Sequence, residues 1–181
     1  MLISWANTTS SRKADELHKY VPGWIDLNKV IERIRATADY QFGRGVGVAL
    51  FPDATNVEFS HTGRIRHVYL KNERLATLRP TDGLFSLGIA GAKKIIENAD
   101  SCKCFVAVQK AVSGFIAKGG DAFAVHVVEA DDEIRAKDEV IVVDEDDKFL
   151  AVGRAVLSGE EMKAFKKGVA VKVRRGIMEE R

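Results

Sequence analysis

A pair of adjacent glycines is the stretch of this sequence whose residue types could bind a phosphate. Gly119 and Gly120 stand between Lys118 and Asp121, at a point where a short helix should end. Glycine adopts the left-handed conformation of such an end without steric cost. A paired glycine also leaves backbone N–H groups bare, so a phosphate or a ribose can approach them closely. An ordinary helix-to-strand turn would explain the same residues, and the surrounding sequence has to distinguish the two interpretations.

Two arginines form a second group that could bind phosphates. Alternation over residues 64–70 predicts a strand that places Arg64 and Arg66 on the same face as Val68 and Leu70. Two guanidinium groups that project to one side could grip neighbouring phosphates. An exposed sheet face that carries solubilising charge is the alternative interpretation.

The motifs of the common catalytic classes do not occur in this sequence. It has no Gly-x-Ser-x-Gly elbow, no Walker loop and no cysteine–histidine nucleophile pair. Cys102 and Cys104 have no second pair at zinc-ligand spacing, and we expect small, half-buried residues near the start of a strand. The glycines of residues 43–47 follow a predicted helix rather than a strand, so they do not match a dinucleotide loop. We therefore predict binding rather than catalysis, with no catalytic residue, metal or cofactor.

The composition is that of a globular protein with an uneven charge distribution. Of the 181 residues, 46% are hydrophobic and 30% are charged, which allows a sizeable core, and the net charge is +2. Residues 129–147 contain ten acids and two bases, whereas residues 148–175 contain eight bases and two acids. A fold that separates these runs would have a basic side suited to phosphate. No apolar run approaches the roughly 20 residues that span a membrane, and the N-terminus lacks a secretory signal, so we expect no membrane partner and a cytoplasmic location.

The first half of the chain predicts a domain in which helices and a sheet are mixed. Asp26 can cap a helix over residues 27–40, and one helical turn is expected at residues 46–51. Alternating segments and turn residues predict a three-stranded meander over residues 56–79, then a short strand and a helix over residues 87–97. A further short helix is expected at residues 12–20. We therefore predict an α+β protein whose first domain occupies residues 1–100.

The second half predicts a small β-barrel-like domain over residues 101–181. It begins with a strand at residues 103–108 and a helix at residues 109–118, with Val112, Phe115 and Ile116 on the inner side of that helix. Short apolar, β-branched segments then predict strands at residues 124–129, 139–144, 149–157 and 169–174. An acidic hairpin turn is expected at residues 144–148, and a second short helix is expected at residues 158–165. Many short strands with two small helices are typical of a compact barrel.

The order of these segments resembles a PUA domain, an RNA-binding pseudobarrel. The combination of Ala151-Val-Gly-Arg154, Ser158-Gly-Glu-Glu-Met162 and Lys167-Gly-Val-Ala-Val171 carries the resemblance. Upstream, His61-Thr-Gly-Arg-Ile-Arg66 and Ala76-Thr-Leu-Arg-Pro-Thr-Asp-Gly83 look like the domain that precedes PUA in archaeal tRNA-guanine transglycosylase and archaeosine synthase. The resemblance covers about residues 30–175. The sequence contains no counterpart of the transglycosylase catalytic barrel.

The resemblance implies where RNA would bind. PUA domains hold RNA on the first helix, on the glycine turn that follows it and on the last strand. The matching positions here are Lys110, Ser113, Gly114, Lys118, Gly119, Gly120, Asp121, Lys167, Gly168, Lys172, Arg174 and Arg175. Glycine N–H groups would contact phosphate or ribose, the lysines and arginines would neutralise phosphates, and Asp121 could discriminate a base or a 2′-hydroxyl. A tRNA acceptor end or the end of a structured RNA stem is the expected target.

Three functions remain open from the sequence. The first, which we expect, is a free-standing RNA-binding protein without catalysis of its own. The second is the RNA-specificity subunit of a two-chain tRNA-modifying enzyme whose catalytic subunit is a separate chain. The third is a small enzyme with its active site between the two domains.

Overall fold

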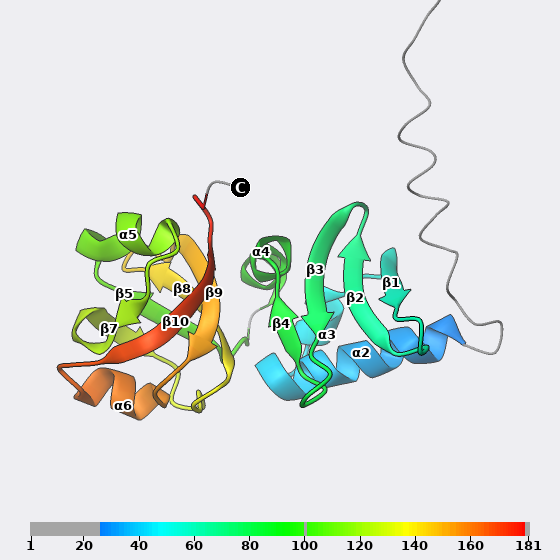
Figure 1. Cartoon of the computed structure of the whole chain (residues 1–181), viewed down its shortest axis with the longest axis horizontal. Helices are drawn as coiled ribbons and strands as arrows, with labels where there is room; N and C mark the ends of the chain where they lie inside the picture. Colours follow the sequence, from blue (N-terminus) through cyan, green and yellow to red (C-terminus); the bar gives the residue numbers. More distant parts are fainter. Residues whose placement is uncertain (1–25, 100, 180–181) are drawn as a thin grey trace, which may run out of the picture.

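The computed structural model describes residues 26–99 and 101–179, which form two sheets with helices packed against them (Figure 1). The predicted helix at residues 12–20 lies outside these residues. No helix within the described ranges is long and apolar enough to cross a membrane. The predicted α+β class is confirmed, with a mixed first part followed by a barrel-like sheet.

The first part is an antiparallel meander with helices packed against it. Asp26 caps the long helix, and its Oδ1 accepts hydrogen bonds from the backbone N–H groups of Asn28 (3.0 Å) and Lys29 (3.4 Å). The sheet order is β1-β2-β3-β4, so each strand pairs with the next in sequence. The elements are α2 (Leu27–Phe42), α3 (Val46–Leu50), β1 (Thr55–Phe59), β2 (Ile65–Leu70), β3 (Glu73–Leu78), β4 (Phe85–Leu87) and α4 (Ile89–Asn98).

The second part is a six-stranded sheet with the order β6-β10-β9-β8-β5-β7. All its strand pairs are antiparallel except β5 and β8, which run parallel. Ser158 caps the last helix with a capping box that Glu161 completes. The elements are β5 (Phe105–Val108), η2 (Lys110–Val112), α5 (Ser113–Ala117), β6 (Ala122–Phe123), η3 (Ala124–His126), β7 (Val127–Ala130), β8 (Glu139–Asp144), β9 (Phe149–Ala155), α6 (Gly159–Ala164) and β10 (Val169–Gly176).

Two predicted elements are divided in the structure. The expected strand at residues 124–129 is only half right: residues 124–126 form a 3-10 turn, η3, between β6 and β7, and residues 127–129 belong to β7. The reason is topological: β6 pairs with β10 and β7 pairs with β5, so the chain must turn between two different partners. The expected helix at residues 109–118 consists of the 3-10 turn η2 and the short helix α5.

The two parts share a hydrophobic core. Every residue of β8 is buried, although alternate residues of a strand point to opposite faces. Ile141 and Val143 join the core of the first part, whereas Val140 and Val142 join the core of the barrel. This two-sided burial explains why the four central residues, Val140–Val143, are all apolar. It also fixes the two parts against each other beside β4 and β10.

Candidate nucleic-acid interface

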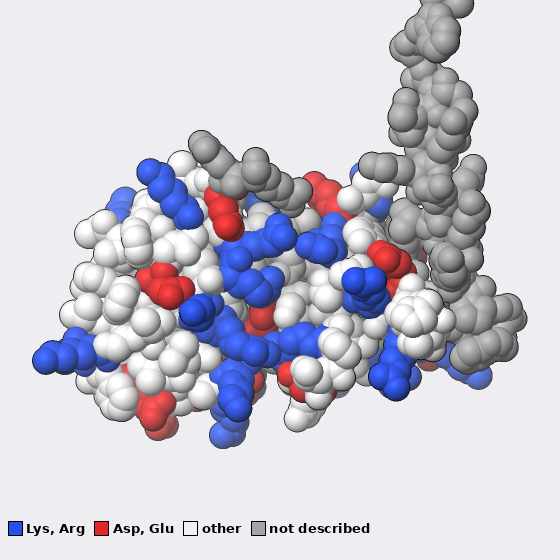
Figure 2. All heavy atoms as spheres, in the orientation of Figure 1, with Lys and Arg blue, Asp and Glu red and all other residues white. Residues whose placement is uncertain are grey.

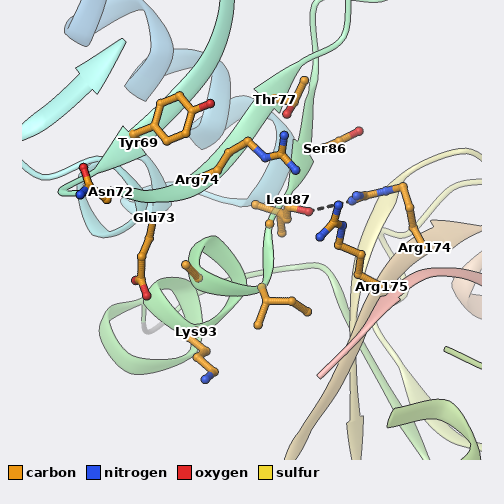
Figure 3. A pocket seen from close by; sticks show the side chains of 13 residues that line it. Tyr69, Asn72, Glu73, Arg74, Thr77, Ser86, Leu87, Lys93, Arg174 and Arg175 are labelled. Atoms are coloured by element: carbon orange, nitrogen blue, oxygen red, sulfur yellow. Dashed lines mark hydrogen bonds between the residues drawn. The ribbon is translucent and has the colours of Figure 1, made fainter. Parts of the chain in front are cut away.

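A cleft of about 590 Å³ lies between the two parts of the molecule (Figure 3). Strands β3 and β4 and the first turns of α4 form one wall, and the end of β10 forms the other. The volume is typical of a site for a small ligand or one segment of a larger one. The lining residues are Tyr69, Asn72, Glu73, Arg74, Thr77, Ser86, Leu87, Gly88, Ile89, Ala90, Lys93, Arg174 and Arg175.

The cleft is basic. Arg74 projects from β3, and Arg174 and Arg175 enter from the opposite wall, with Lys93 on α4 (Figure 3). Among the described residues, no acid forms an ion pair with Arg74, Lys93 or Arg175, and Glu73 is the single acid in the lining. In the space-filling view, Lys and Arg side chains gather in a band over the junction between the two parts (Figure 2). Such a concentration of positive charge over a concave surface favours a polyanion.

A buried carboxylate holds the two walls together. Glu139 on β8 is 2% exposed, and its Oε1 accepts a hydrogen bond of 2.8 Å from the backbone N–H of Leu87 on β4. The guanidinium of Arg174 donates to the same carboxylate and, at 2.8 Å, to the backbone carbonyl of Leu87. Arg79 lies 4.0 Å from the other carboxylate oxygen. Burial raises the pKa of Glu139 above its ordinary value, while Arg174 opposes that shift. Arg174 therefore links the two parts through Glu139 and Leu87, and it also lines the cleft.

The glycine turn differs from the prediction of bare N–H groups. The N–H of Gly119 donates to the carbonyl of Ile116 (2.9 Å), and that of Gly120 donates to the carbonyl of Phe115 (3.0 Å). Gly119 has a φ of +99°, which confirms the predicted left-handed helix end. Asp121 also has an internal partner, because its Oδ1 accepts from the backbone N–H of Val173 at 2.9 Å. The turn leads from α5 into β6 and is bonded to β10 through Asp121, and both glycine N–H groups already have backbone partners.

Phe115 is not on the inner side of its helix as predicted. Its side chain is 59% exposed, whereas Ile116 is buried. The helix is only five residues long and is followed at once by the glycine turn, so its faces do not follow the pattern of a full helix. The ring of Phe115 instead covers Gly120, where a Cβ atom would lie 2.2 Å from the ring carbon Cε1.

Lys110 and Ser113 belong to a network around the acidic hairpin turn. The ammonium group of Lys110 pairs with Asp146, and its backbone N–H donates to Glu145 at 2.9 Å. The hydrogen bond that the ammonium group donates to Asp146 raises the pKa of Lys110. The hydroxyl of Ser113 lies 3.5 Å from Asp144, a buried residue that caps the turn. Lys110 thus already has an acidic partner on the exposed surface of this turn.

The remaining predicted residues lie at different places. Lys172, Arg174 and Arg175 all lie on β10, and Arg174 and Arg175 line the cleft. Lys167 and Gly168 precede that strand and lie roughly 25 Å from Arg175 at the usual rise per residue. Arg64 and Arg66 are exposed at the start of β2, which β3 separates from β4. Two further predicted positions are exposed: Gly114 on α5 and Lys118 at the C-cap of that helix.

Arg74 and Lys93 are the candidate residues that sequence reasoning missed. Both are exposed charged residues on predicted elements, and the chain has 28 lysines and arginines in all. Nothing in their local sequence separates them from the solvated charges elsewhere. Only the contact of β4 and α4 with the barrel brings them opposite Arg175.

The two cysteines are free, and burial distinguishes them. Cys104 is 2% exposed, and burial raises the pKa of its thiol well above the ordinary value; Cys102 is half-buried. Because the thiolate is the reactive form, we expect iodoacetamide to modify Cys102 before Cys104 at pH 8. Mass spectrometry of tryptic peptides after timed labelling measures the two rates. Equal rates in the folded protein would contradict this order, and equal rates in urea provide the control.

Two family models match the chain. Residues 32–101 match the patch-forming domain C2 of tRNA-guanine transglycosylase, and residues 105–177 match the PUA domain. Among curated proteins, the tRNA-guanine(15) transglycosylase of Pyrococcus furiosus is 49% identical over 148 residues, which are 82% of this chain and 25% of that protein. The enzyme of the same name from Methanothermobacter thermautotrophicus is 44% identical over 81% of this chain and 22% of its own length. This chain therefore spans about a quarter of the length of these relatives.

Solved structures share the fold over most of the chain. A hypothetical protein of Pyrococcus horikoshii OT3 superposes with a TM-score of 0.68 at 24% identity, covering 84% of this chain and 92% of that one. A conserved PUA domain protein of Thermoplasma acidophilum gives a TM-score of 0.62 at 22% identity, over 86% and 93% of the two chains. At these identities the likeness concerns the fold alone.

Proposed function

We propose that this chain, which joins a C2 domain of the transglycosylase type to a PUA domain, is an RNA-binding protein that recognises tRNA, most directly at its acceptor end, or a structured RNA stem. One observation carries the proposal: cations from both domains converge on a single cleft. Arg74 and Lys93 come from the first domain, and Arg175 comes from the last strand of the second. RNA supplies a phosphate at every nucleotide, so a bound strand can contact both walls at once.

The lining of the cleft favours binding over acid–base chemistry. The hydroxyl of Ser86 and the side chain of Asn72 can donate hydrogen bonds to phosphate or ribose oxygens. The hydroxyl of Thr77 already contacts Nδ1 of His67 at 3.0 Å. Burial lowers the pKa of His67, which disfavours the charged form of this ring. The cleft therefore combines fixed positive charge with a few polar groups.

We expect the protein to bind total tRNA at low salt and to lose affinity steeply as salt rises. Each phosphate that a cation neutralises adds about 0.7–0.9 to the slope of log K against log salt, so three contacts give a slope of about −2 to −3. Filter binding or electrophoretic mobility shift in 50–300 mM KCl measures this slope. Absence of binding at 50 mM KCl, or binding that does not weaken with salt, would contradict the proposal.

A separate experiment identifies which part of the tRNA is bound. tRNA with and without its terminal CCA, in parallel with a hairpin of the acceptor-stem sequence, should show whether the 3′ end is bound. Preferential binding of the intact acceptor end supports the tRNA assignment. Equal affinity for every RNA would restrict the function to general RNA binding.

A second candidate is the RNA-specificity subunit of a two-chain tRNA-modifying enzyme. It is supported by the similarity of four-fifths of this chain to one part of proteins named as tRNA-guanine(15) transglycosylases. Copurification of a catalytic chain from the native source, with tRNA modification activity that needs both chains, would support this candidate. A chain that purifies alone in complex with tRNA would favour the first.

A further inference from the structure

A second groove, of about 320 Å³, lies at the other end of helix α4 from the basic cleft. Helix α4 lies between the two sheets (Figure 1) and is about 15 Å long at the usual rise per residue. Its first turns line the basic cleft through Ile89 and Lys93, whereas Ile96 in its last turn and Ala99 at its C-cap line the second groove. The linings of the two sites have no residue in common.

The floor of this groove is an open part of the hydrophobic core between the two domains. Strand β5 lies between β7 and β8, and its residue Ala107 is directly opposite Glu129 on one side and Val143 on the other. Directly opposite residues share a face of the sheet, and Phe105, two residues before Ala107, lies on that face too. Phe105 and Ala107 pack against the core of the first domain but remain half-buried. Apolar surface therefore stays accessible in the groove.

Three carboxylates form the rim, and we call the site the acidic groove. Glu129 belongs to β7, Asp131 follows that strand, and Asp147 belongs to the turn between β8 and β9. Oδ2 of Asp131 accepts a hydrogen bond of 2.7 Å from the backbone N–H of Phe105. Within the described part of the chain, the side chains of Glu129 and Asp147 form no hydrogen bond, and none of the three carboxylates has a cationic partner.

Neighbouring acids of the same acidic run are paired, which distinguishes them from the rim. Asp132 forms an ion pair with Lys163, and Glu133 forms one with Lys103. Burial raises the pKa of Asp131, since a half-buried carboxylate without a cation is unfavourable in its charged form. The fold therefore leaves the negative charge of the rim uncompensated, and a cationic ligand would compensate it.

The shape and chemistry of the groove select the kind of cation. No group of His, Cys, Asp and Glu among the described residues could hold a metal ion, so the carboxylates do not converge on one point. RNA is unfavourable here, because three carboxylates repel phosphates. Lysine and arginine have an apolar stem and a charged head, which match an apolar floor beneath an acidic rim. A small polyamine would pair with the rim but would leave the aromatic floor at Phe105 poorly covered.

We propose that the acidic groove is a docking site for a protein partner, which binds through a basic segment that also carries apolar side chains. Lysine or arginine heads of that segment pair with Glu129, Asp131 and Asp147, and an apolar side chain covers Phe105 and extends the core between the domains. This site is separate from the basic cleft, and the inference does not rest on the proposed function.

The test uses a fluorescein-labelled peptide, Ala-Arg-Leu-Arg-Leu-Arg-Ala, and follows its binding by fluorescence anisotropy in about 50 mM KCl. The double substitution Glu129→Lys and Asp147→Lys should weaken binding by at least about tenfold, because each change replaces an attraction with a repulsion. The matched control, Glu32→Lys with Glu160→Lys, makes the same change in net charge on exposed residues of α2 and α6. It should change affinity by less than about threefold. Equal thermal midpoints confirm that both variants are folded.

Two further peptides separate the charge from the apolar contact. Serine in place of both leucines should weaken binding by about fivefold or more, because the floor is no longer covered. Glutamate in place of the arginines should abolish binding. Two-dimensional amide NMR locates the site: the peptide should shift the signals of Phe105, Ala107 and Glu129, while those of Arg74 and Arg175 in the basic cleft stay unchanged.

Several outcomes would overturn the docking site. It is wrong if wild type does not bind the arginine–leucine peptide at about 1 mM, or if the groove variant binds as tightly as the control. It is also wrong if the shifted amides lie outside the groove. Displacement of the peptide by an equal concentration of spermidine would identify a site for small cations instead of a protein partner. None of these results bears on tRNA binding in the basic cleft, which the salt titration tests.

Discussion

Replacing Glu139 with alanine should lower the free energy of unfolding by about 3–5 kcal/mol, the usual cost of breaking a buried ion pair from one side. The substitution removes the acceptor of the Leu87 N–H across the junction of the two domains. It also leaves Arg79, whose side chain is 12% exposed, with less compensation for its buried charge. Urea denaturation followed by circular dichroism measures the change.

The matched control for this prediction is Glu129→Ala. Glu129 is an exposed glutamate on β7, and we expect its replacement to change stability by no more than about 0.5 kcal/mol. If Glu139→Ala lowers the free energy of unfolding by less than about 1 kcal/mol, the hydrophobic contact through Ile141 and Val143 holds the domains together without the carboxylate.

Glu139→Gln tests the contribution of the charge through its pH dependence. Because burial raises the pKa of Glu139, the folded state binds this proton more tightly than the unfolded chain does. The stabilisation from that proton is complete below the ordinary glutamate pKa of about 4.3 and is lost as pH rises through the raised pKa of the folded state. Wild type should therefore lose stability relative to Glu139→Gln over this interval. A difference in stability between wild type and Glu139→Gln that does not change with pH would contradict the raised pKa of Glu139.

The double substitution Arg74→Ala and Arg175→Ala should weaken tRNA binding by at least about a hundredfold at low salt. Each arginine projects into the cleft from a different domain, and a hydrogen bond between charged partners contributes about 1.5–3 kcal/mol. The salt slope should become shallower by about 1.5–2, which corresponds to two lost phosphate contacts. Mobility-shift titrations at several KCl concentrations measure both quantities.

The pair Arg64→Ala and Arg66→Ala makes the same change in charge on β2, away from the cleft. We expect this variant to bind tRNA within about threefold of wild type at 150 mM salt, where charges more than about 8 Å away are screened. If this variant loses as much tRNA affinity as the cleft variant, the RNA interface includes the open face of the meander rather than the cleft alone. Unchanged binding in the cleft variant would exclude the cleft as the site.

Local pattern was sufficient for most of the secondary structure. Asp26 and Ser158 mark the starts of two helices, because a capping side chain satisfies backbone N–H groups within three residues of itself. The apolar run Val140–Val143 similarly indicates the strand at residues 139–144, which the structure covers on both faces. These signals depend on neighbours in sequence, and the structure confirms them.

The glycine turn shows where the sequence ceases to be sufficient. The pair Gly119–Gly120 determined a left-handed helix end, because only the absence of a Cβ makes that conformation cheap. The state of its N–H groups and the exposure of Phe115 were decided by the short helix and by the packing of Gly176 against the turn. The turn itself can be predicted from its own residues, whereas its contacts with distant residues cannot.

For the charged residues too, some properties follow from the sequence and others only from the tertiary structure. The sequence alone determined two charge runs and a resemblance to a PUA domain that follows a domain of the transglycosylase type, and the family models match both. Tertiary structure decided which cations meet, through contacts such as Lys110 with Asp146, 36 residues apart, and Arg174 with Leu87, 87 residues apart. A charged side chain has the same local pattern whether it is paired, solvated or part of a cleft. Its role depends on the partner that the fold places beside it, so the cleft of Arg74, Lys93 and Arg175 exists only once the two domains have packed together.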